Sequence, residues 1–274
     1  MLDKLIITLA PTGNVPTRKL NESTPVTPDQ IVADIEKCRE MGVSVGHLHV
    51  RDEEEKPTCD RAIFKELIDK IHAKKMDIIT QVSTGARGGG NTAEWRGQML
   101  DLNIEMASLS TGSSNFPNAV NANPPELIEH LVTKMNENNV KPEIEAFDVA
   151  MIDNAKFLIK KGVLKTPVHF NLVMNVPGSI KGSPKNLMHM IESLPPDSTC
   201  SVMGVGNAQV QMLTMAIAMG AHVRTGLEDV LVMPDGTQAT NEKLVQQVVN
   251  IAKAVGREMA TPDEARVMLG LPAR

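Results

Sequence analysis

The stretch Val45-Gly46-His47-Leu48-His49-Val50-Arg51-Asp52 predicts a buried strand that ends in polar residues. Its apolar residues, together with Val43 just before it, have the density of a parallel strand covered on both faces. Residues two apart on a strand point to the same side, so His47 and His49 present their imidazoles together. Two neutral imidazoles aimed into one space can bind a divalent metal, zinc first among them, if an acid completes the site. The same spacing also fits two hydrogen-bonded core histidines.

Seven further apolar segments predict strands, and helical patterns alternate with them along the chain. Thr27-Pro28-Asp29 begins a helix well, with a hydroxyl N-cap, a proline in the first turn and an acid near the positive end of the helix dipole. The further strands are expected at residues 5–10, 78–82, 106–110, 143–147, 168–174, 200–203 and 222–225, and the helices at 27–42, 60–75, 94–101 (after a glycine-rich loop), 125–138, 153–161, 184–194, 208–219, 241–255 and 262–269.

Eight strand–helix units in regular alternation predict an α/β protein that forms a single (β/α)8 TIM barrel. We expect residues 1–274 to form one domain, with the last helix as a C-terminal extension. An open doubly wound sheet is the alternative. The barrel is favoured because polar side chains follow the carboxyl ends of the predicted strands, where barrel active sites are built. These side chains are His49, Ser83, Ser108, Glu145 and Glu228.

Composition narrows the possible partners. The chain has 274 residues and 42% hydrophobic residues, enough for a sizeable core. A net charge of -5 provides no basic surface for nucleic acid or an anionic membrane. Aromatic residues make up only 2% and none is Tyr, so the stacking platforms of single-strand and sugar binders are missing. We therefore expect a small or acyl-type substrate.

The cysteines and the apolar segments indicate where the protein resides. Cys38, Cys59 and Cys200 are odd in number and widely spaced, which favours neither a disulfide framework nor a thiolate metal site. Residues 1–10 lack the features of a signal peptide, and no window has the apolar length of a bilayer span. We expect a cytoplasmic protein.

A carboxylate for the metal can come from the run Arg224-Thr225-Gly226-Leu227-Glu228-Asp229. If the eighth strand ends near Gly226, Glu228 and Asp229 lie over the barrel mouth, next to the histidine strand because the barrel closes. Glu228 could then complete a site of two imidazoles and one carboxylate, with open positions for substrate or water. Alternatively, both acids are partners of a helix dipole in the first turn of a helix.

The chain resembles the beta-keto acid cleavage enzyme family over nearly its whole length. The His-Leu-His-Val-Arg and Arg-x-Gly-x-Glu-Asp segments, in this order, are the specific part of the resemblance. The matching segments are Thr12-Gly13, His47-Leu48-His49-Val50-Arg51, Gln81-Val82-Ser83-Thr84-Gly85, Pro142-Glu143-Ile144-Glu145, Pro177-Gly178, Pro184-Lys185-Asn186-Leu187-Met188 and Arg224 to Asp229.

The resemblance implies a zinc-dependent barrel that condenses a 3-keto acid with acetyl-CoA and gives acetoacetate and a new acyl-CoA. One zinc per chain would chelate the keto acid through its carboxylate and 3-keto oxygen, which acidifies the carbon between them. The enolate would attack the thioester, and the released thiolate would complete a retro-Claisen cleavage. The family also implies a homo-oligomer, either a tetramer or a dimer.

The resemblance also implies a role for each residue of this chain that matches a functional position of the family. His47, His49 and Glu228 would bind the metal. Glu145 would be the base, helped by Asp229 and Arg224, although a structural salt bridge is the common role of such a carboxylate. The substrate-binding residues would include Ser83, Gly85 and Ser108, where Ser108 stands in place of a family threonine. The other histidines, at positions 72, 130, 169, 189 and 222, match no role.

The first loop departs from the family member that acts on an aminated substrate. That member has an acid at the position where this chain has Val15, which follows Asn14. We place both residues at the substrate site. An unpaired cation there would be costly to bury, so we expect a neutral or apolar tail beyond the 3-keto group. Arg18 and Lys19 make an acidic tail the second option.

Two other functions are compatible with the paired histidines. A metal-dependent hydrolase would use metal-bound water and no CoA, and a non-catalytic metabolite-binding barrel would keep the pocket without turnover. Nickel or cobalt also suits imidazole and carboxylate ligands. The turn from Gly204 to Asn207 opens a helix and could receive an anionic CoA group, although such turns often serve only to join strand and helix.

Overall fold

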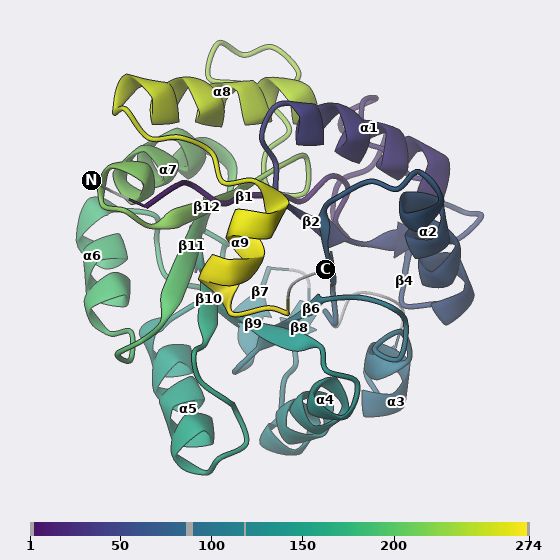
Figure 1. The fold of residues 1–274 in the computed structure, drawn as a ribbon, viewed down its shortest axis with the longest axis vertical. Coiled ribbons are helices and arrows are strands. Elements are labelled where there is room, and N and C mark those ends of the chain that lie inside the picture. The colour runs from purple at the N-terminus through teal and green to yellow at the C-terminus, as the bar shows by residue number, and fades with distance from the viewer. Residues whose placement is uncertain (1–2, 86–89, 118, 273–274) are drawn as a thin grey trace.

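Eight parallel strands form a closed barrel in the computed structural model, which describes residues 3–85, 90–117 and 119–272 (Figure 1). The order around the barrel is β1-β12-β11-β10-β9-β6-β5-β2, and β1 pairs with both β12 and β2. The predicted fold class is confirmed. The strands are β1 (Ile7–Leu9), β2 (Val45–Leu48), β5 (Ile79–Val82), β6 (Met106–Ser110), β9 (Lys141–Ala146), β10 (His169–Met174), β11 (Thr199–Gly204) and β12 (His222–Thr225).

Helices α1 to α8 surround this barrel (Figure 1). They begin where the sequence supplies caps. The Thr27 side chain accepts a hydrogen bond from the Gln30 N–H and the Gln30 side chain returns one, so α1 has a complete capping box. The helices are α1 (Pro28–Glu40), α2 (Arg61–Ala73), α3 (Ala93–Gly97), α4 (Pro125–Glu137), α5 (Val149–Lys160), α6 (Pro184–Glu192), α7 (Gln209–Ala218), α8 (Asn241–Ala254) and α9 (Pro262–Leu269).

Some boundaries differ from the prediction. Helix α5 begins at Val149, earlier than expected, because the Asp148 side chain caps it. Helix α3 ends at Gly97 and is shorter than expected. Two small antiparallel hairpins were not predicted: β3 (Val50–Arg51) with β4 (Pro57–Thr58), and β7 (Ser114–Phe116) with β8 (Ala119–Asn121). A 3-10 turn, Gly206–Ala208, precedes α7.

Residues 86–89 of the glycine-rich loop lie outside the described part of the chain. Within that part, no helix is both long and apolar enough to cross a bilayer. The assignment of residues 1–274 to one domain stays a prediction.

Helix α9 closes the amino-terminal end of the barrel, where it lies across the ring of strands (Figure 1). Its apolar side packs against the inward residues at the bottom of four neighbouring strands, so this end is filled by side chains. The cluster consists of Ile6, Val45, Ile79, Met106, Ala260, Ala265 and Leu269. A substrate therefore reaches the barrel from the carboxyl end of the strands.

Arg266 holds α9 in this position. Its buried guanidinium lies 2.7 Å from Glu105, 2.8 Å from Asp77 and 2.9 Å from Asp263. Arg266→Ala removes a buried side chain and its charge-assisted hydrogen bonds, so we expect a loss of about 2–4 kcal/mol in the free energy of unfolding. Urea denaturation measures this loss. Arg61→Ala, which breaks the solvent-exposed pair with Asp101, is the control and should change little. Equal effects of the two substitutions would contradict the assigned role of Arg266.

Candidate metal centre and active-site cavity

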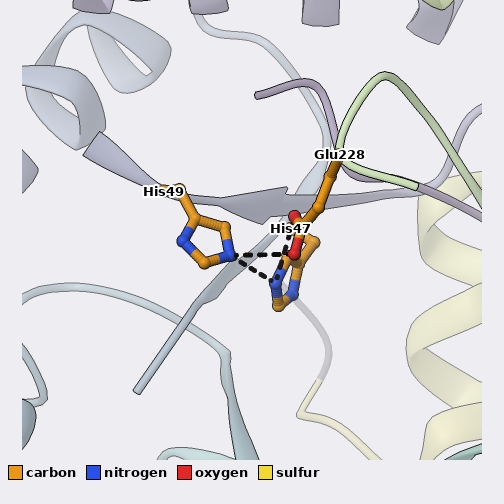
Figure 2. A group of neighbouring side chains, drawn as sticks. All are labelled: His47, His49 and Glu228. Atoms are coloured by element: carbon orange, nitrogen blue, oxygen red, sulfur yellow. Dashed lines mark hydrogen bonds and ion pairs between the residues drawn. The ribbon is translucent and has the colours of Figure 1, made fainter. Parts of the chain in front are cut away.

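The histidine segment leaves β2 at the open end of the barrel. His47 lies within β2, and His49 follows it, between β2 and β3. Both side chains are buried, and their Nε2 atoms lie 3.1 Å apart. Figure 2 shows the two rings turned toward the same carboxylate, that of Glu228. The prediction that these imidazoles converge is therefore confirmed by the geometry.

Glu228 reaches the histidines because the chain passes very close to β1 after β12. Gly226 has a φ of 146°, and a side chain there would have its Cβ 2.1 Å from the Ala10 carbonyl oxygen. Only glycine permits this approach. The Glu228 N–H then donates to the same Ala10 oxygen at 3.1 Å. Glu228 Oε1 lies 3.2 Å from His49 Nε2, and Oε2 lies 3.8 Å from His47 Nε2.

This group fits a divalent cation. One ligand atom from each of His47, His49 and Glu228 lies within 4.8 Å of the others. Glu228 Oε2 is buried and has no hydrogen-bond partner among the described residues, as expected of an atom that binds something else. Burial lowers the pKa of His47 to about 3, so its imidazole is neutral and offers a lone pair.

The two histidines are oriented through their other ring nitrogens. His47 Nδ1 lies 2.5 Å from Gln81 Oε1, and His49 Nδ1 lies 2.9 Å from Asn14 Oδ1. These hydrogen bonds leave both Nε2 atoms directed toward Glu228. Gln81 was not predicted to have a role. In the sequence, the signal for Gln81 was its place two residues before Ser83. In the structure, Gln81 lies on β5 in register with His47 on β2.

Arg224 links three carboxylates at the barrel mouth. Its guanidinium nitrogens lie 2.8 Å from Glu228, 2.9 and 3.1 Å from Asp229, and 3.3 Å from Glu145. If all three acids are ionised, one guanidinium leaves two negative charges without compensation in a buried site. A divalent cation supplies that charge, which is a second reason why the ligand set suits one.

The three acids have different affinities for protons. Burial raises the pKa of Glu145 to about 7, although Arg224 opposes the shift. Burial likewise raises the pKa of Asp229 to about 6, again opposed by Arg224. Burial would raise the pKa of Glu228 too, but Arg224 and the histidines hold it well below its usual range. Glu228 is thus a permanent anion, and Glu145 can exchange a proton near neutral pH.

A cavity of about 560 Å³ opens above these groups. Nine of the eleven site residues predicted from the sequence line this cavity, and His47 and Ser108 are the two that do not. The residues predicted from sequence that line the cavity are Asn14, Val15, His49, Ser83, Gly85, Glu145, Arg224, Glu228 and Asp229.

Ser108 is the predicted substrate-binding residue that the structure does not bring to this cavity. It lies one layer deeper in β6, where its hydroxyl is buried 3.4 Å from the Thr84 N–H. Inward-facing residues alternate along a strand, so Ser110, two positions on, lines the cavity instead. The Ser110 hydroxyl lies 3.4 Å from Glu145 Oε2.

The cavity also has a set of apolar lining residues, which the sequence analysis did not predict. These residues come from the unpredicted β7–β8 hairpin, from the ends of β10 and β11, and from the loops that follow β9, β10 and β11. They are Phe116, Pro117, Ala119, Phe147, Val173, Val176, Pro177, Met203 and Val205.

His169 and His222 are structural, in agreement with the absence of a family role for them. His169 Nδ1 lies 2.8 Å from the Thr199 hydroxyl and its Nε2 lies 3.1 Å from the Ser201 hydroxyl. His222 Nδ1 accepts a hydrogen bond from the Ile6 N–H at 3.1 Å. Burial lowers the pKa of His222 to about 4, so it stays neutral at physiological pH.

A closed (β/α)8 barrel with two imidazoles and a carboxylate at its open end is the general architecture of a metal-dependent barrel enzyme. Comparison with known proteins makes this assignment more specific. The chain belongs to the beta-keto acid cleavage enzyme family, whose model matches residues 4–271. It is therefore an enzyme of beta-keto acid cleavage, as the resemblance predicted.

Two curated relatives and one solved structure illustrate the similarity. The chain is 42% identical to a 3-keto-5-aminohexanoate cleavage enzyme of Acetoanaerobium sticklandii, over 98% of this chain and 99% of that one. It is 38% identical to a 3-oxoadipate:acetyl-CoA acetyltransferase of Cupriavidus necator, over 100% and 97%. A complex of ObcA with oxaloacetate matches with a TM-score of 0.78 at 21% identity, over 91% of this chain and 67% of that one. That last likeness concerns the fold alone.

The ligand set predicts the metal content of variants. We expect the purified protein to hold about one divalent cation per chain, and His47→Ala or His49→Ala to weaken its binding by more than about a hundredfold, because each removes a ligand. Elemental analysis after dialysis against a chelator measures this. His189→Ala, on the exposed part of α6, is the matched control and should keep the metal. Full metal retention by both ligand variants would refute the site.

Proposed function

We propose that the protein exchanges acyl groups between a 3-keto acid and acetyl-CoA, giving acetoacetate and a new acyl-CoA. The observation that carries this proposal is the convergence of His47, His49 and Glu228 with the Glu145–Arg224–Asp229 group in one cavity. Acetyl-CoA as the second substrate is supported by the name of the 38% identical relative, an acetyl-CoA acetyltransferase.

A divalent cation, with zinc as the first candidate, would be held by His47, His49 and Glu228 and would make the keto acid's α-carbon more acidic by withdrawing charge from its oxygens. The keto acid's carboxylate is assigned to the side of the cavity formed by Ser83 and Gly85. Ser83 Oγ accepts a hydrogen bond from the Gly85 N–H at 3.2 Å, so its own hydroxyl proton is free to be donated to an anion.

Glu145 is the proposed base. It takes the α-proton onto its carboxylate, and Arg224, 3.3 Å away, stabilises negative charge beside it. The enolate carbon forms a bond to the acetyl carbonyl carbon, and the thioester C–S bond breaks to release the CoA thiolate. The thiolate then adds to the former 3-keto carbon. The adjacent C–C bond breaks, the new acyl-CoA leaves, and the acetoacetate enolate recovers a proton from Glu145.

The apolar residues that line the cavity support an apolar tail on the keto acid. Among the described lining residues, the acids are Glu145, Glu228 and Asp229, and all three pair with Arg224. An aminated tail would find no unpaired carboxylate there. An acidic tail is supported less, because Arg18 does not line the cavity and pairs with Gln30 and Glu55.

Three further expectations stay predictions: the homo-oligomer, the cytoplasmic location and the identity of the metal.

A metal-dependent hydrolase could use the same three ligands, but it would release products without consuming acetyl-CoA. An assay that follows acetyl-CoA consumption and acetoacetate formation together separates exchange from hydrolysis and from binding without turnover.

The proposed role of Glu145 as the base can be tested by the pH dependence of the reaction rate. Because its pKa is about 7, we expect kcat/KM of exchange to fall about tenfold for each pH unit below 7, as the base becomes protonated and inactive. Glu145→Gln should lower kcat by about 10²–10⁴-fold and abolish that acidic limb. Glu137→Gln, on the exposed face of α4, is the matched control. A Glu145→Gln enzyme with an unchanged pH profile would exclude Glu145 as the base.

The proposed contact of Val15 with the substrate tail can be tested by the preference between keto acids with and without an amino group. We expect the enzyme to prefer 3-oxohexanoate over its 5-amino derivative by about tenfold or more, because the ammonium would meet Val15 and other apolar lining residues and no unpaired carboxylate. Val15→Glu should raise kcat/KM for the aminated acid, whereas Val15→Gln, of similar size and uncharged, should not. A panel that also contains 3-oxoadipate gives the comparison. If neither Val15 variant responds to the amino group, the assignment of the tail pocket is wrong.

A further inference from the structure

Asn14 makes a contact that its expected role as a substrate-binding residue did not include. It lies in the loop between β1 and α1, and its Oδ1 is 2.9 Å from His49 Nδ1. His49 Nε2 faces Glu228 at 3.2 Å, on the side where the ligand atoms converge. A histidine that offers its Nε2 lone pair to a cation carries its proton on Nδ1, so the Asn14 atom that meets it must be the oxygen.

This hydrogen bond also decides where the amide nitrogen of Asn14 lies. With Oδ1 directed at His49, Nδ2 is directed at Gly85, where a Cβ would be 3.7 Å from it. The same Cβ would lie 3.3 Å from the Ser83 hydroxyl oxygen. The Asn14 amide N–H groups and the Ser83 hydroxyl therefore lie on one side of the cavity, and both can donate to an anion.

The loop that carries Asn14 is held by Arg51, the last residue of the His-Leu-His-Val-Arg motif and one without a role in the proposed chemistry. The buried Arg51 guanidinium donates to the Gly13 carbonyl at 2.8 Å and to the Pro16 carbonyl at 2.6 Å. These two carbonyls bracket Asn14 and Val15 in the chain. A third hydrogen bond, from Arg51 Nε, goes to the Thr12 hydroxyl at 3.2 Å.

The loop also touches the third metal ligand. Gly13 has a φ of +62°, and a Cβ at this position would lie 2.3 Å from Glu228 Cγ, so the loop backbone is packed directly against that side chain. His49 and Arg51 are two residues apart on one segment. One short stretch of chain thus fixes both a metal ligand and the loop that orients it.

We propose that Asn14 is a positioning residue with two functions: its amide oxygen fixes the tautomer and direction of His49 for metal binding, and its amide nitrogen binds the carboxylate of the 3-keto acid together with Ser83. Arg51 holds the loop in the conformation that permits both. The second function rests on the proposed acyl-exchange activity, whereas the first concerns the metal alone.

Two substitutions at the same position separate these functions. Asn14→Ala removes both the acceptor and the donor, so we expect metal affinity to fall about 10–100-fold and acetoacetate binding to weaken as well. Asn14→Asp keeps an acceptor for His49 but presents a carboxylate oxygen where the N–H groups were. It should retain wild-type or tighter metal affinity and bind acetoacetate more than about tenfold more weakly, because two carboxylates then face each other.

The measurements do not depend on turnover. Competition with a chromogenic chelator gives the affinity for zinc, the visible spectrum of the cobalt-substituted protein reports the ligand geometry, and calorimetry gives acetoacetate binding to the zinc-loaded protein. Asn250→Ala, on the exposed surface of α8, is the matched control. Arg51→Lys tests whether Arg51 holds the loop that carries Asn14. It should reproduce the metal loss of Asn14→Ala, since an ammonium cannot bridge several carbonyls as a guanidinium does.

Each function can fail independently. Wild-type zinc affinity and an unchanged cobalt spectrum in Asn14→Ala would overturn the orientation of His49. Unchanged acetoacetate binding in Asn14→Asp would overturn the carboxylate contact. If Arg51→Lys is folded, as judged by circular dichroism, and keeps wild-type zinc affinity, Arg51 does not hold the loop in the conformation that metal binding needs. If wild-type zinc-loaded protein does not bind acetoacetate, the proposed function fails together with the carboxylate contact, and the metal measurements still decide the orientation of His49.

Discussion

Closure of the sheet through β1, which pairs with β12 on one side and β2 on the other, is the constraint on which the candidate site depends. It brings two segments about 180 positions apart in the chain to one point. Glu228 comes beside His47 and His49 only because of this closure and because Gly226 lets the chain pass against Ala10. An open sheet with the same strands would leave the carboxylate and the imidazoles on distant edges.

Electrostatics at the barrel mouth are organised by a single buried guanidinium. Arg224 contacts Glu145, Glu228 and Asp229, yet the three acids differ in the direction of their pKa shifts. Glu228 is held as an anion by Arg224 and two histidines, whereas burial dominates at Glu145. In the proposed function, similar carboxylates thus take different roles, Glu228 as a metal ligand and Glu145 as an exchangeable base, because of their surroundings.

Much of the fold and part of the site could be predicted from local signals. Strand and helix alternation, caps such as Thr27 and the histidine spacing are properties of neighbouring residues, and they indicated the barrel and the paired imidazoles correctly. Ser108 shows the limit of such signals. A strand pattern identifies which residues share a face, but the depth of each residue in the barrel depends on register with the neighbouring strands, and that register places Ser110 rather than Ser108 beside Glu145.

Local patterns alone reveal the eight alternating units, the side of the strand that carries His47 and His49, and the chemical types available at the strand ends. The folded barrel was needed to reveal that Asn14 and Gln81 are hydrogen-bonded to the two imidazoles, that the β7–β8 hairpin supplies apolar residues to the cavity, and that α9 fills the opposite end. The two kinds of feature differ in the distance along the chain over which they act. Periodicity and capping act within a few residues, whereas these contacts join segments whose proximity exists only after the barrel has closed.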